Sequence, residues 1–233
     1  MEFIAEGFAE AFRLIMGLDD QAYSALWTTL YTSSVSVLIA LAVGMPLGFL
    51  LGYHDFPLRR TLRAVVDTLM AVPTVVVGLI VFSMLTYQGP LGEYRLLYTV
   101  EGIMIGQTLL ALPIVISLTA TAVETLDKRL FETLLTLGAN GWRMALTVLR
   151  EARYAMLGVM LVAYSRVVAE VGIAMMIGGN INFHTRTLTT AIALETGKGE
   201  FALGIALGLF LVLIALMLNA ALSTFKAKAA RAR

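Results

Sequence analysis

Four stretches of this chain run for more than 20 residues without an aspartate, glutamate, lysine or arginine, namely residues 22–53, 68–92, 102–123 and 201–225. About 20 consecutive apolar residues, wound as a helix, cross the hydrocarbon core of a bilayer. A fifth stretch, residues 154–178, has a suitable length but contains Arg166 and Glu170. The pattern predicts an all-α, polytopic membrane bundle of five transmembrane helices.

The composition supports this fold class. Hydrophobic residues make up 59% of the chain and charged residues only 14%, whereas soluble domains carry about 25% charged residues. We therefore expect lipid around the chain and no nucleic-acid partner. We place it in a bacterial (or archaeal) cell membrane as a multi-pass protein. Cysteine is absent, which excludes disulfides and thiolate metal sites.

The basic residues are unevenly distributed between the two sides of the predicted bundle. Twelve of the 17 follow the stretches of residues 22–53, 102–123 and 201–225: Arg59, Arg60, Arg63, Lys128, Arg129, Arg143, Arg150, Arg153, Lys226, Lys228, Arg231 and Arg233. Four lie on the other side. Basic connections stay in the cytoplasm. We therefore expect the N-terminus outside and the C-terminus inside, with residues 226–233 as a basic cytoplasmic tail.

Residues 1–21 precede the first stretch and carry apolar side chains at helical spacing. These are Ile4, Phe8, Phe12 and Ile15, and Glu2, Glu6 and Glu10 lie on another face. The pattern predicts a short amphipathic extracytoplasmic helix on the membrane surface.

The connection of residues 125–153 is long for a membrane protein and lies on the predicted cytoplasmic side. Helix-forming sequence flanks a turn at Gly138-Ala139-Asn140-Gly141, with Glu132 before it and Trp142 after it. A glycine allows the chain to reverse tightly and to approach another surface closely. This helix-turn-helix predicts a docking site for another protein, and the alternative is a passive connector.

Arg166 and Glu170 lie four residues apart inside the fifth stretch, hence on one helix face. A charge near the bilayer centre costs roughly 2.5–3.5 kcal/mol on insertion scales, so such groups face a cavity, a partner or each other. Two interpretations stay open: an internal ion pair that holds helix packing, and a pair that lines or gates a translocation route. Asp67, near the inner end of the second stretch, is expected to pair with the basic cluster of residues 59–63.

The segment that follows the fifth stretch is rich in glycine, asparagine and threonine. Gly178-Gly179-Asn180 is expected to end the helix, because these residues tolerate positive φ. Thr185, Thr187, Thr189 and Thr190 offer hydroxyls and Arg186 a cation on the outer side. The segment either caps helices and returns the chain, or contacts a binding protein or a passing anion.

Two glycine stripes suggest close helix packing. Gly44, Gly48 and Gly52 share one face of the first stretch, and Gly204 and Gly208 share one face of the last. Small residues four apart let helix backbones approach in lipid. The stripes indicate either a seam within one chain or an interface between subunits. Pro46, Pro73 and Pro113 lie inside the stretches and predict kinks.

Several activities are excluded by missing patterns. The chain has no Gly-x-x-x-x-Gly-Lys-Ser/Thr loop for ATP and no Gly-x-Ser-x-Gly or His-Glu-x-x-His pattern for hydrolysis. The only histidines, His54 and His184, are too far apart in sequence to suggest a metal site. We expect no catalytic residues, no metal and no cofactor bound by this chain.

Two motifs resemble a known family. The Glu132-Thr133-Leu134 triplet, followed by Gly138-Ala139 and Asn140, is similar to the ATPase-docking loop of type I ABC importer permeases. The second motif begins at Glu170-Val171-Gly172 and continues with Gly178-Gly179-Asn180-Ile181, His184-Thr185-Arg186, Thr189-Thr190-Ala191-Ile192 and Glu195-Thr196. It resembles the permease subunits of molybdate and tungstate importers, the tungstate branch most of all.

The resemblance covers residues 24–225 and implies that residues 22–225 form the transmembrane domain of an oxyanion importer. It implies a coupling helix from Leu134 to Trp142 in a groove of a separate ATPase chain, which holds ATP and Mg. The docking residues it implies are Glu132, Leu134, Gly138, Ala139, Asn140 and Trp142. Candidates for the translocation pathway or gate are Arg166, Glu170, Gly172, Asn180, Thr185 and Arg186.

The implied partners are a second copy of the permease, two ATPase subunits and an extracytoplasmic oxyanion-binding protein. Tungstate is the expected substrate, with molybdate or sulfate as alternatives. A small channel or a structural membrane subunit is the alternative from another class, and it leaves the long basic loop without a role.

Overall fold

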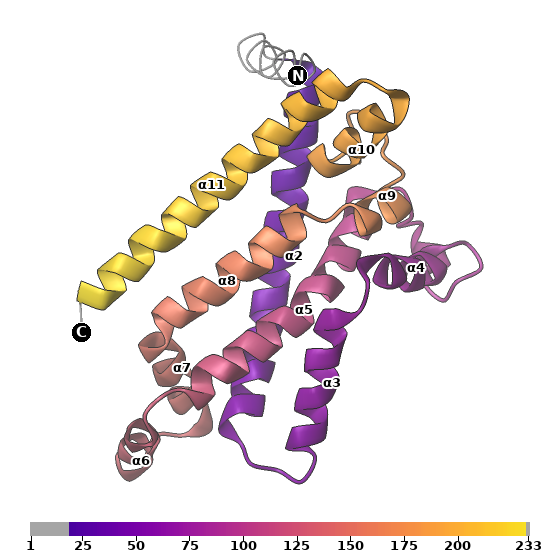
Figure 1. Cartoon of the computed structure of the whole chain (residues 1–233). Coiled ribbons are helices and arrows are strands. Elements are labelled where there is room, and N and C mark those ends of the chain that lie inside the picture. Colours follow the sequence, from indigo (N-terminus) through magenta and orange to yellow (C-terminus); the bar gives the residue numbers. More distant parts are fainter. Residues whose placement is uncertain (1–18, 232–233) are drawn as a thin grey trace.

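The computed structural model of the chain describes residues 19–231, and within them every regular element is helical (Figure 1). The helices are α2 (Asp20–Tyr53), α3 (Arg59–Ala71), α4 (Thr74–Leu85), α5 (Val100–Glu124), α6 (Lys128–Thr136), α7 (Gly141–Glu151), α8 (Arg153–Val168), α9 (Gly172–Gly178), α10 (Leu188–Lys198), α11 (Phe201–Arg231) and the 3-10 turn η1 (Gly92–Tyr94). The all-α prediction is confirmed. The predicted surface helix of residues 1–21 lies, apart from its last residues, outside the described chain.

The two long helices α2 and α5 form the centre of the bundle. Their backbones approach closely along the first glycine stripe. A Cβ atom on Gly48 would lie 2.7 Å from the carbonyl oxygen of Ile116, and one on Gly52 would lie 2.7 Å from that of Ala120. Only glycine fits such an approach. This stripe is therefore a packing seam within the chain, whereas a Cβ on Gly208 of the second stripe would have no neighbour within 4 Å.

A continuous apolar core joins α2, α5 and α8. Its buried side chains include Val37, Ala40, Leu41, Ala111, Ile114, Val115, Met156, Val159 and Ala163. Ser36 of α2 adds a polar contact in this region, donating to the side-chain oxygen of Gln107 on α5 at 3.2 Å. A buried hydrogen bond of this kind fixes the register of two apolar helices.

Two of the predicted spans are broken. Helices α3 and α4 meet at an angle of 96°, and α8 and α9 meet at 57°. Pro73 explains the first break, because proline has no N–H to donate and drives the preceding residue, Val72, out of the helical region, to ψ 130°. The kink predicted at Pro73 is therefore confirmed. The second break falls inside residues 154–178, where the sequence pattern predicts one helix and no kink. Pro46 and Pro113, in contrast, lie inside the continuous helices α2 and α5.

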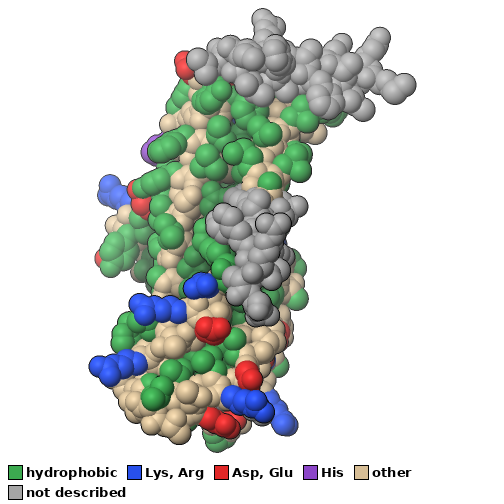
Figure 2. All heavy atoms as spheres, turned by 90° about the vertical axis from the view of Figure 1, so that its left-hand side faces the viewer, with side chains coloured by type: hydrophobic (Ala, Val, Ile, Leu, Met, Phe, Trp, Pro, Cys, Tyr) green, Lys and Arg blue, Asp and Glu red, His purple; other side chains and the backbone are tan. Residues whose placement is uncertain are grey.

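The helices differ in how well they suit a membrane. By length and composition, α2 and α5 are each able to cross it alone, and each bent pair gives one further candidate. The described apolar part of α11, Phe201–Met217, is shorter. The five-span count and the orientation of the termini therefore stay predictions. On the face shown in Figure 2, most charged side chains gather at the end where α6 and α7 lie, and hydrophobic side chains cover much of the rest.

Candidate functional site

The loop between α5 and α8 folds as a helical hairpin at one end of the bundle (Figure 1). Asp127 caps α6 by accepting from the N–H of Arg129 at 2.9 Å, and Asn140 caps α7 by accepting from the N–H of Arg143 at 2.9 Å. Between them Gly138 adopts φ 72°. The predicted helix-turn-helix is confirmed. The single helix expected from Leu134 to Trp142 is wrong, because Gly138 and the cap at Asn140 end one helix and start the next.

One side of this hairpin is anchored to the bundle. Met144 and Val148 of α7 are buried in a cluster with Phe49 of α2 and Val123 of α5. Phe131 of α6 packs on Tyr53 with ring centroids 5.1 Å apart. The hairpin therefore touches the ends of both central helices, so a force on it reaches the bundle directly.

The other side of the hairpin has apolar side chains exposed at the surface. Leu135, Leu137 and Trp142 are 58%, 77% and 74% exposed. Glu132 and Gly138 are exposed as well, and no atom lies within 4 Å of a Cβ built on Gly138. An apolar patch outside the core, rimmed by polar residues, is typical of a surface that binds another protein. Four of the six predicted docking residues lie in or next to the turn, namely Gly138, Ala139, Asn140 and Trp142. Glu132 is exposed on α6, and Leu134 is half-buried against the cluster of Phe49.

The charge pair inside the fifth stretch forms at the break between α8 and α9. Nη1 of Arg166 lies 3.3 Å from Oε2 of Glu170. The Glu170 side chain is 2% exposed and that of Arg166 is 43% exposed. Oε1 of Glu170 also accepts from the N–H of Ile173 at 3.2 Å. The carboxylate thus satisfies one of the free N–H groups at the start of α9, at a break that contains no proline.

Both broken pairs meet at Gly172. A Cβ on this residue would lie 3.2 Å from Oε1 of Glu170 and 3.3 Å from Cγ2 of Val75, at the start of α4. The backbone oxygen of Glu170 also accepts from the hydroxyl of Thr189 on α10 at 2.8 Å. Three of the predicted pathway residues, Arg166, Glu170 and Gly172, are therefore brought together where four helices converge.

The other three predicted pathway residues belong to the turn before α10. The hydroxyl of Thr185 is buried, donates to the carbonyl of Gly178 and accepts from the N–H of Ile181. Asn180, at φ 53°, accepts from Nε of Arg186 at 3.2 Å. Thr187 and Thr190 form a capping box for α10. The capping interpretation accounts for these hydrogen bonds.

Arg186 of this turn borders an open space. It lines a cavity of about 270 Å³ that also includes Asp19 and Glu195. Glu195 is paired with Lys198 at 2.9 Å. His54 and His184 are exposed and lie in different connections, and the described residues hold no group of three or more metal-ligating side chains of the His, Cys, Asp and Glu type.

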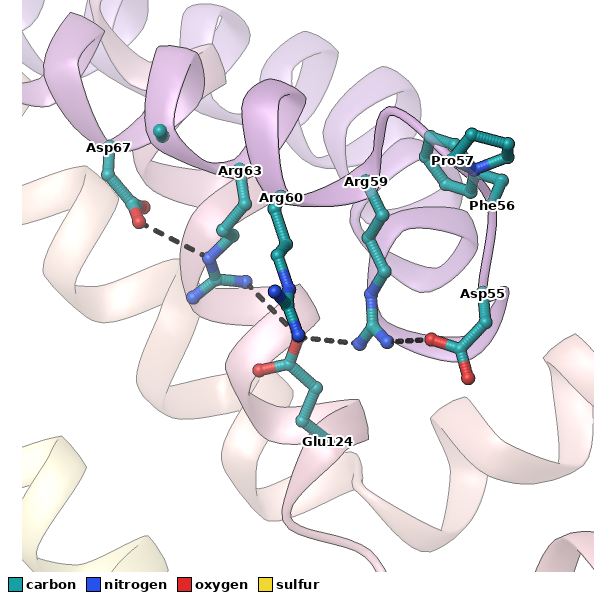
Figure 3. A pocket seen from close by; sticks show the side chains of 9 residues that line it. Asp55, Phe56, Pro57, Arg59, Arg60, Arg63, Asp67 and Glu124 are labelled. Atoms are coloured by element: carbon teal, nitrogen blue, oxygen red, sulfur yellow. Dashed lines mark hydrogen bonds and ion pairs between the residues drawn. The ribbon is translucent and has the colours of Figure 1, made fainter.

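A second charge cluster lies at the hairpin end of the bundle (Figure 3). Arg63 of α3 lies 3.3 Å from Asp67, so the predicted pairing of Asp67 is confirmed. Arg59 contacts Asp55 and lies 2.9 Å from Glu124, the last residue of α5. These side chains border a cavity of about 670 Å³. Sequence analysis missed Glu124, because spacing along the chain gives no sign that it faces α3.

Comparison with known proteins agrees with this architecture. Residues 44–230 match the family described as "Binding-protein-dependent transport system inner membrane component". The chain is 47% identical to the tungstate uptake system permease protein TupB of Campylobacter jejuni, over 94% of this chain and 92% of that relative. It is 38% identical to TupB of Peptoclostridium acidaminophilum, over 94% and 96% of the two chains.

The fold is also shared with a solved transporter. The structure matches a chain of the MetNI methionine ABC transporter, solved in inward-facing conformations, with a TM-score of 0.73 and 17% identity over 91% of this chain and 97% of that one. At 17% identity, the match supports a shared fold and nothing further. The family match covers most of the chain, and both relatives are well above 30% identical. The chain therefore belongs to the family of binding-protein-dependent transport system inner membrane components, and it is a membrane protein.

Proposed function

We propose that this chain is the permease subunit of an ATP-driven ABC importer for an oxyanion, and that the anion is tungstate. The observation that carries the proposal is the 47% identity to a tungstate uptake permease over nearly the whole length of both chains. Two copies of the chain line the route, because five helices are too few to enclose a hydrated dianion. The N-terminus is outside and the C-terminus is cytoplasmic.

The hairpin of residues 125–153 is the proposed docking site for a separate ATPase chain that holds ATP and Mg. Its exposed tip supports this role, since Leu137 and Trp142 offer apolar surface and Gly138 leaves room for close approach. ATP closes the two ATPase subunits, the two docked hairpins move together, and the attached helices re-orient the route. Such alternating access needs rigid elements that move between two discrete arrangements.

The proposed route passes the junction of the two broken spans. Transporters often place substrate contacts where membrane helices are interrupted and helix N-termini face an anion. Helix α4 begins here without a side-chain cap, so its first N–H groups carry a partial positive charge. Arg166 adds one cation, whose charge is balanced by Glu170. A weakly positive junction attracts a dianion without trapping it.

Selection of the anion rests mainly on an extracytoplasmic binding protein in this proposal. Because tungstate and molybdate are both tetrahedral dianions of nearly equal size, the permease does not need to distinguish them by shape. Molybdate is the first alternative substrate and sulfate the second.

The experiment that tests the function is oxyanion uptake by liposomes that contain the permease, its ATPase subunits and the binding protein. We expect uptake that requires ATP and prefers tungstate over molybdate and sulfate. Anion flux through the permease alone, without ATP, would show a channel instead. ATP-dependent uptake of sulfate in preference to the other two anions would overturn the tungstate assignment.

Variants at the hairpin tip test the docking step. Gly138→Leu and Glu132→Lys are expected to uncouple ATP hydrolysis from uptake. Gly138→Asn is the matched control, because asparagine tolerates positive φ and keeps the turn. Gly197→Leu places the same bulk on an exposed glycine outside the hairpin. Normal transport by both tip variants would show that the ATPase does not dock here.

A further inference from the structure

Helix α3 is held to the bundle mainly by polar contacts. None of its 13 residues is buried. Three of its side chains reach α5 in a regular series: Arg59 to Glu124 at 2.9 Å, Arg63 to the hydroxyl of Thr121, and Asp67 to the hydroxyl of Ser117 at 2.6 Å. We call these six residues the polar ladder.

The register of the polar ladder is set by helix geometry. Arg59, Arg63 and Asp67 are four residues apart and share one face of α3. Their partners Glu124, Thr121 and Ser117 descend along one face of α5, so the two helices are paired antiparallel. The opposite side of α3 exposes Leu58, Leu62, Val65 and Leu69. The ladder is therefore the specific attachment of α3 to α5, and toward the Pro73 bend apolar side chains of the two helices line a shared cavity.

The ladder can open at little cost. The side chains of Arg59 and Glu124 are 26% and 37% exposed, and those of Arg63 and Asp67 are 24% and 48% exposed. Partly exposed ion pairs contribute little to stability. The adjoining cavity of about 670 Å³ leaves space for the arginine side chains to move. At its far end α3 meets the 96° bend at Pro73, which can serve as a pivot.

Glu124 joins the ladder to the hairpin. It is the last residue of α5, and Asp127, three residues later, caps α6. It binds Arg59 at 2.9 Å and lies 3.9 Å from Arg63. Arg59 in turn donates to the carbonyls of Leu51 and Gly52 at the end of α2. A displacement of the hairpin therefore reaches Glu124 before it reaches any other charged residue of α5.

The series of contacts that starts at Glu124 ends at the junction of the broken spans. Helix α3 leads through Val72 and Pro73 into α4, whose Val75 contacts the position of Gly172 beside Glu170. Motion of α3 about the Pro73 bend would thus change the surroundings of the Arg166–Glu170 pair. The α2–α5 seam offers no such freedom, because its backbones already touch.

We propose that Glu124 is a positioning residue for transport, which couples the hairpin to the α3–α4 span through the polar ladder. The ladder opens and closes once in each transport cycle. This inference rests on the proposed function, in which an ATPase moves the hairpin.

A reversible disulfide across the ladder tests the proposal. The chain has no cysteine, so Asp67→Cys with Ser117→Cys introduces one pair whose native side chains touch at 2.6 Å. We expect the oxidised importer to lose ATP-dependent oxyanion uptake, and a reductant to restore it. The matched control is Ser36→Cys with Gln107→Cys between α2 and α5, whose native side-chain oxygens lie 3.2 Å apart. Its oxidation is expected to leave uptake unchanged.

The outcomes separate the two proposals. If the oxidised ladder variant imports as well as its reduced form, the ladder does not open and the role of Glu124 is overturned, while the proposed function stands. If the reduced variants and the parent chain all fail to import an oxyanion with ATP, the proposed function fails and the coupling role falls with it.

Removal of its charge tests Glu124 itself. Glu124→Gln is expected to raise the ATP consumed per anion imported by roughly 1.4- to fivefold, which corresponds to the loss of one partly exposed ion pair. Glu124→Asp keeps a carboxylate for Arg59 and Arg63 and should hold the ratio closer to that of the parent. Arg60→Gln is the matched control, because Arg60 lines the same cavity but its side chain makes no hydrogen bond or ion pair with another described residue. A ratio unchanged by Glu124→Gln contradicts the proposal.

Discussion

Helix α5 meets its two neighbours α2 and α3 in opposite ways. Against α2 it forms a glycine seam in which backbones touch, with Cβ positions as close as 2.7 Å to a carbonyl oxygen. Against α3 it presents Ser117, Thr121 and Glu124, and none of the residues of α3 is buried. The seam is short-range, apolar and insensitive to salt, whereas the ladder is partly exposed and ionic. One helix thus combines a fixed side with a side that is able to move.

The difference explains how a membrane bundle can be both stable and mobile. Lipid gives apolar helices no hydrophobic reason to associate, so close backbone packing has to hold the fixed pair together. Polar contacts between partly exposed side chains can exchange partners at low cost. The following variants test this comparison through the stability of the isolated permease, in order of expected effect.

Gly48→Ala should destabilise the chain most, by about 1–3 kcal/mol, because the added methyl meets the Ile116 backbone and overpacks the seam. Gly158→Ala is the matched control, since nothing lies within 4 Å of a Cβ on that helical glycine. It should stabilise the chain by up to about 1 kcal/mol. Thermal unfolding in detergent measures both. Equal midpoints for the two variants would show that the seam is not close-packed.

Glu170→Ala should have the next largest effect. It should lower the free energy of unfolding by about 1–3 kcal/mol, because the N–H of Ile173 and the guanidinium of Arg166 lose their acceptor. Glu170→Gln keeps an oxygen for Ile173 and should recover part of the loss. The same unfolding measurement applies. If the alanine and glutamine variants match the parent, the carboxylate does not hold the break between α8 and α9.

Glu124→Gln should reduce stability by only about 0.2–1 kcal/mol, the range of a partly exposed ion pair. The effect should shrink at 1 M salt, where charges are screened beyond about 3 Å. Unfolding at low and high salt measures it. A loss as large as that of Gly48→Ala, or one that salt leaves unchanged, would mean that the ladder is as rigid as the seam.

Trp142→Ala should leave stability within about ±0.5 kcal/mol, because the side chain is 74% exposed. It should nevertheless weaken co-purification with the ATPase subunit. Trp27→Ala is the matched control, since the other tryptophan of the chain is 69% exposed on α2. Retention of the ATPase by the Trp142 variant would exclude this side chain from the docking surface.

Much of the helical framework follows from local sequence. The runs without charge predict α2 and α5 to within two residues at each end, since hydrophobic length and flanking polar residues decide those limits. The hairpin follows from Gly138 and Asn140, which stop one helix and start another. The pairs Arg166–Glu170 and Arg63–Asp67 follow from the four-residue helical spacing.

The remaining features depend on contacts that are distant in the chain. A proline predicts a kink, but the 96° angle at Pro73 depends on how α4 packs against α9. At the break before α9, the carboxylate of Glu170 turns back on a backbone N–H, a contact that the sequence pattern does not reveal. The hydroxyl of Thr185 looks available in the sequence and is used inside its own turn. Glu124 binds Arg59, which lies 65 residues away, and no spacing rule connects them.

The central claim is that the two sides of α5 behave differently while ATP is hydrolysed. Distances between paired spin labels measure this most directly. One label at Thr125→Cys, just beyond α5, is combined with a second at Thr61→Cys on α3 or at Leu50→Cys on α2, all three being exposed positions. The assembled importer is studied with and without ATP. The account predicts that the distance to α3 changes with ATP and that the distance to α2 does not, and equal behaviour of the two distances would contradict it.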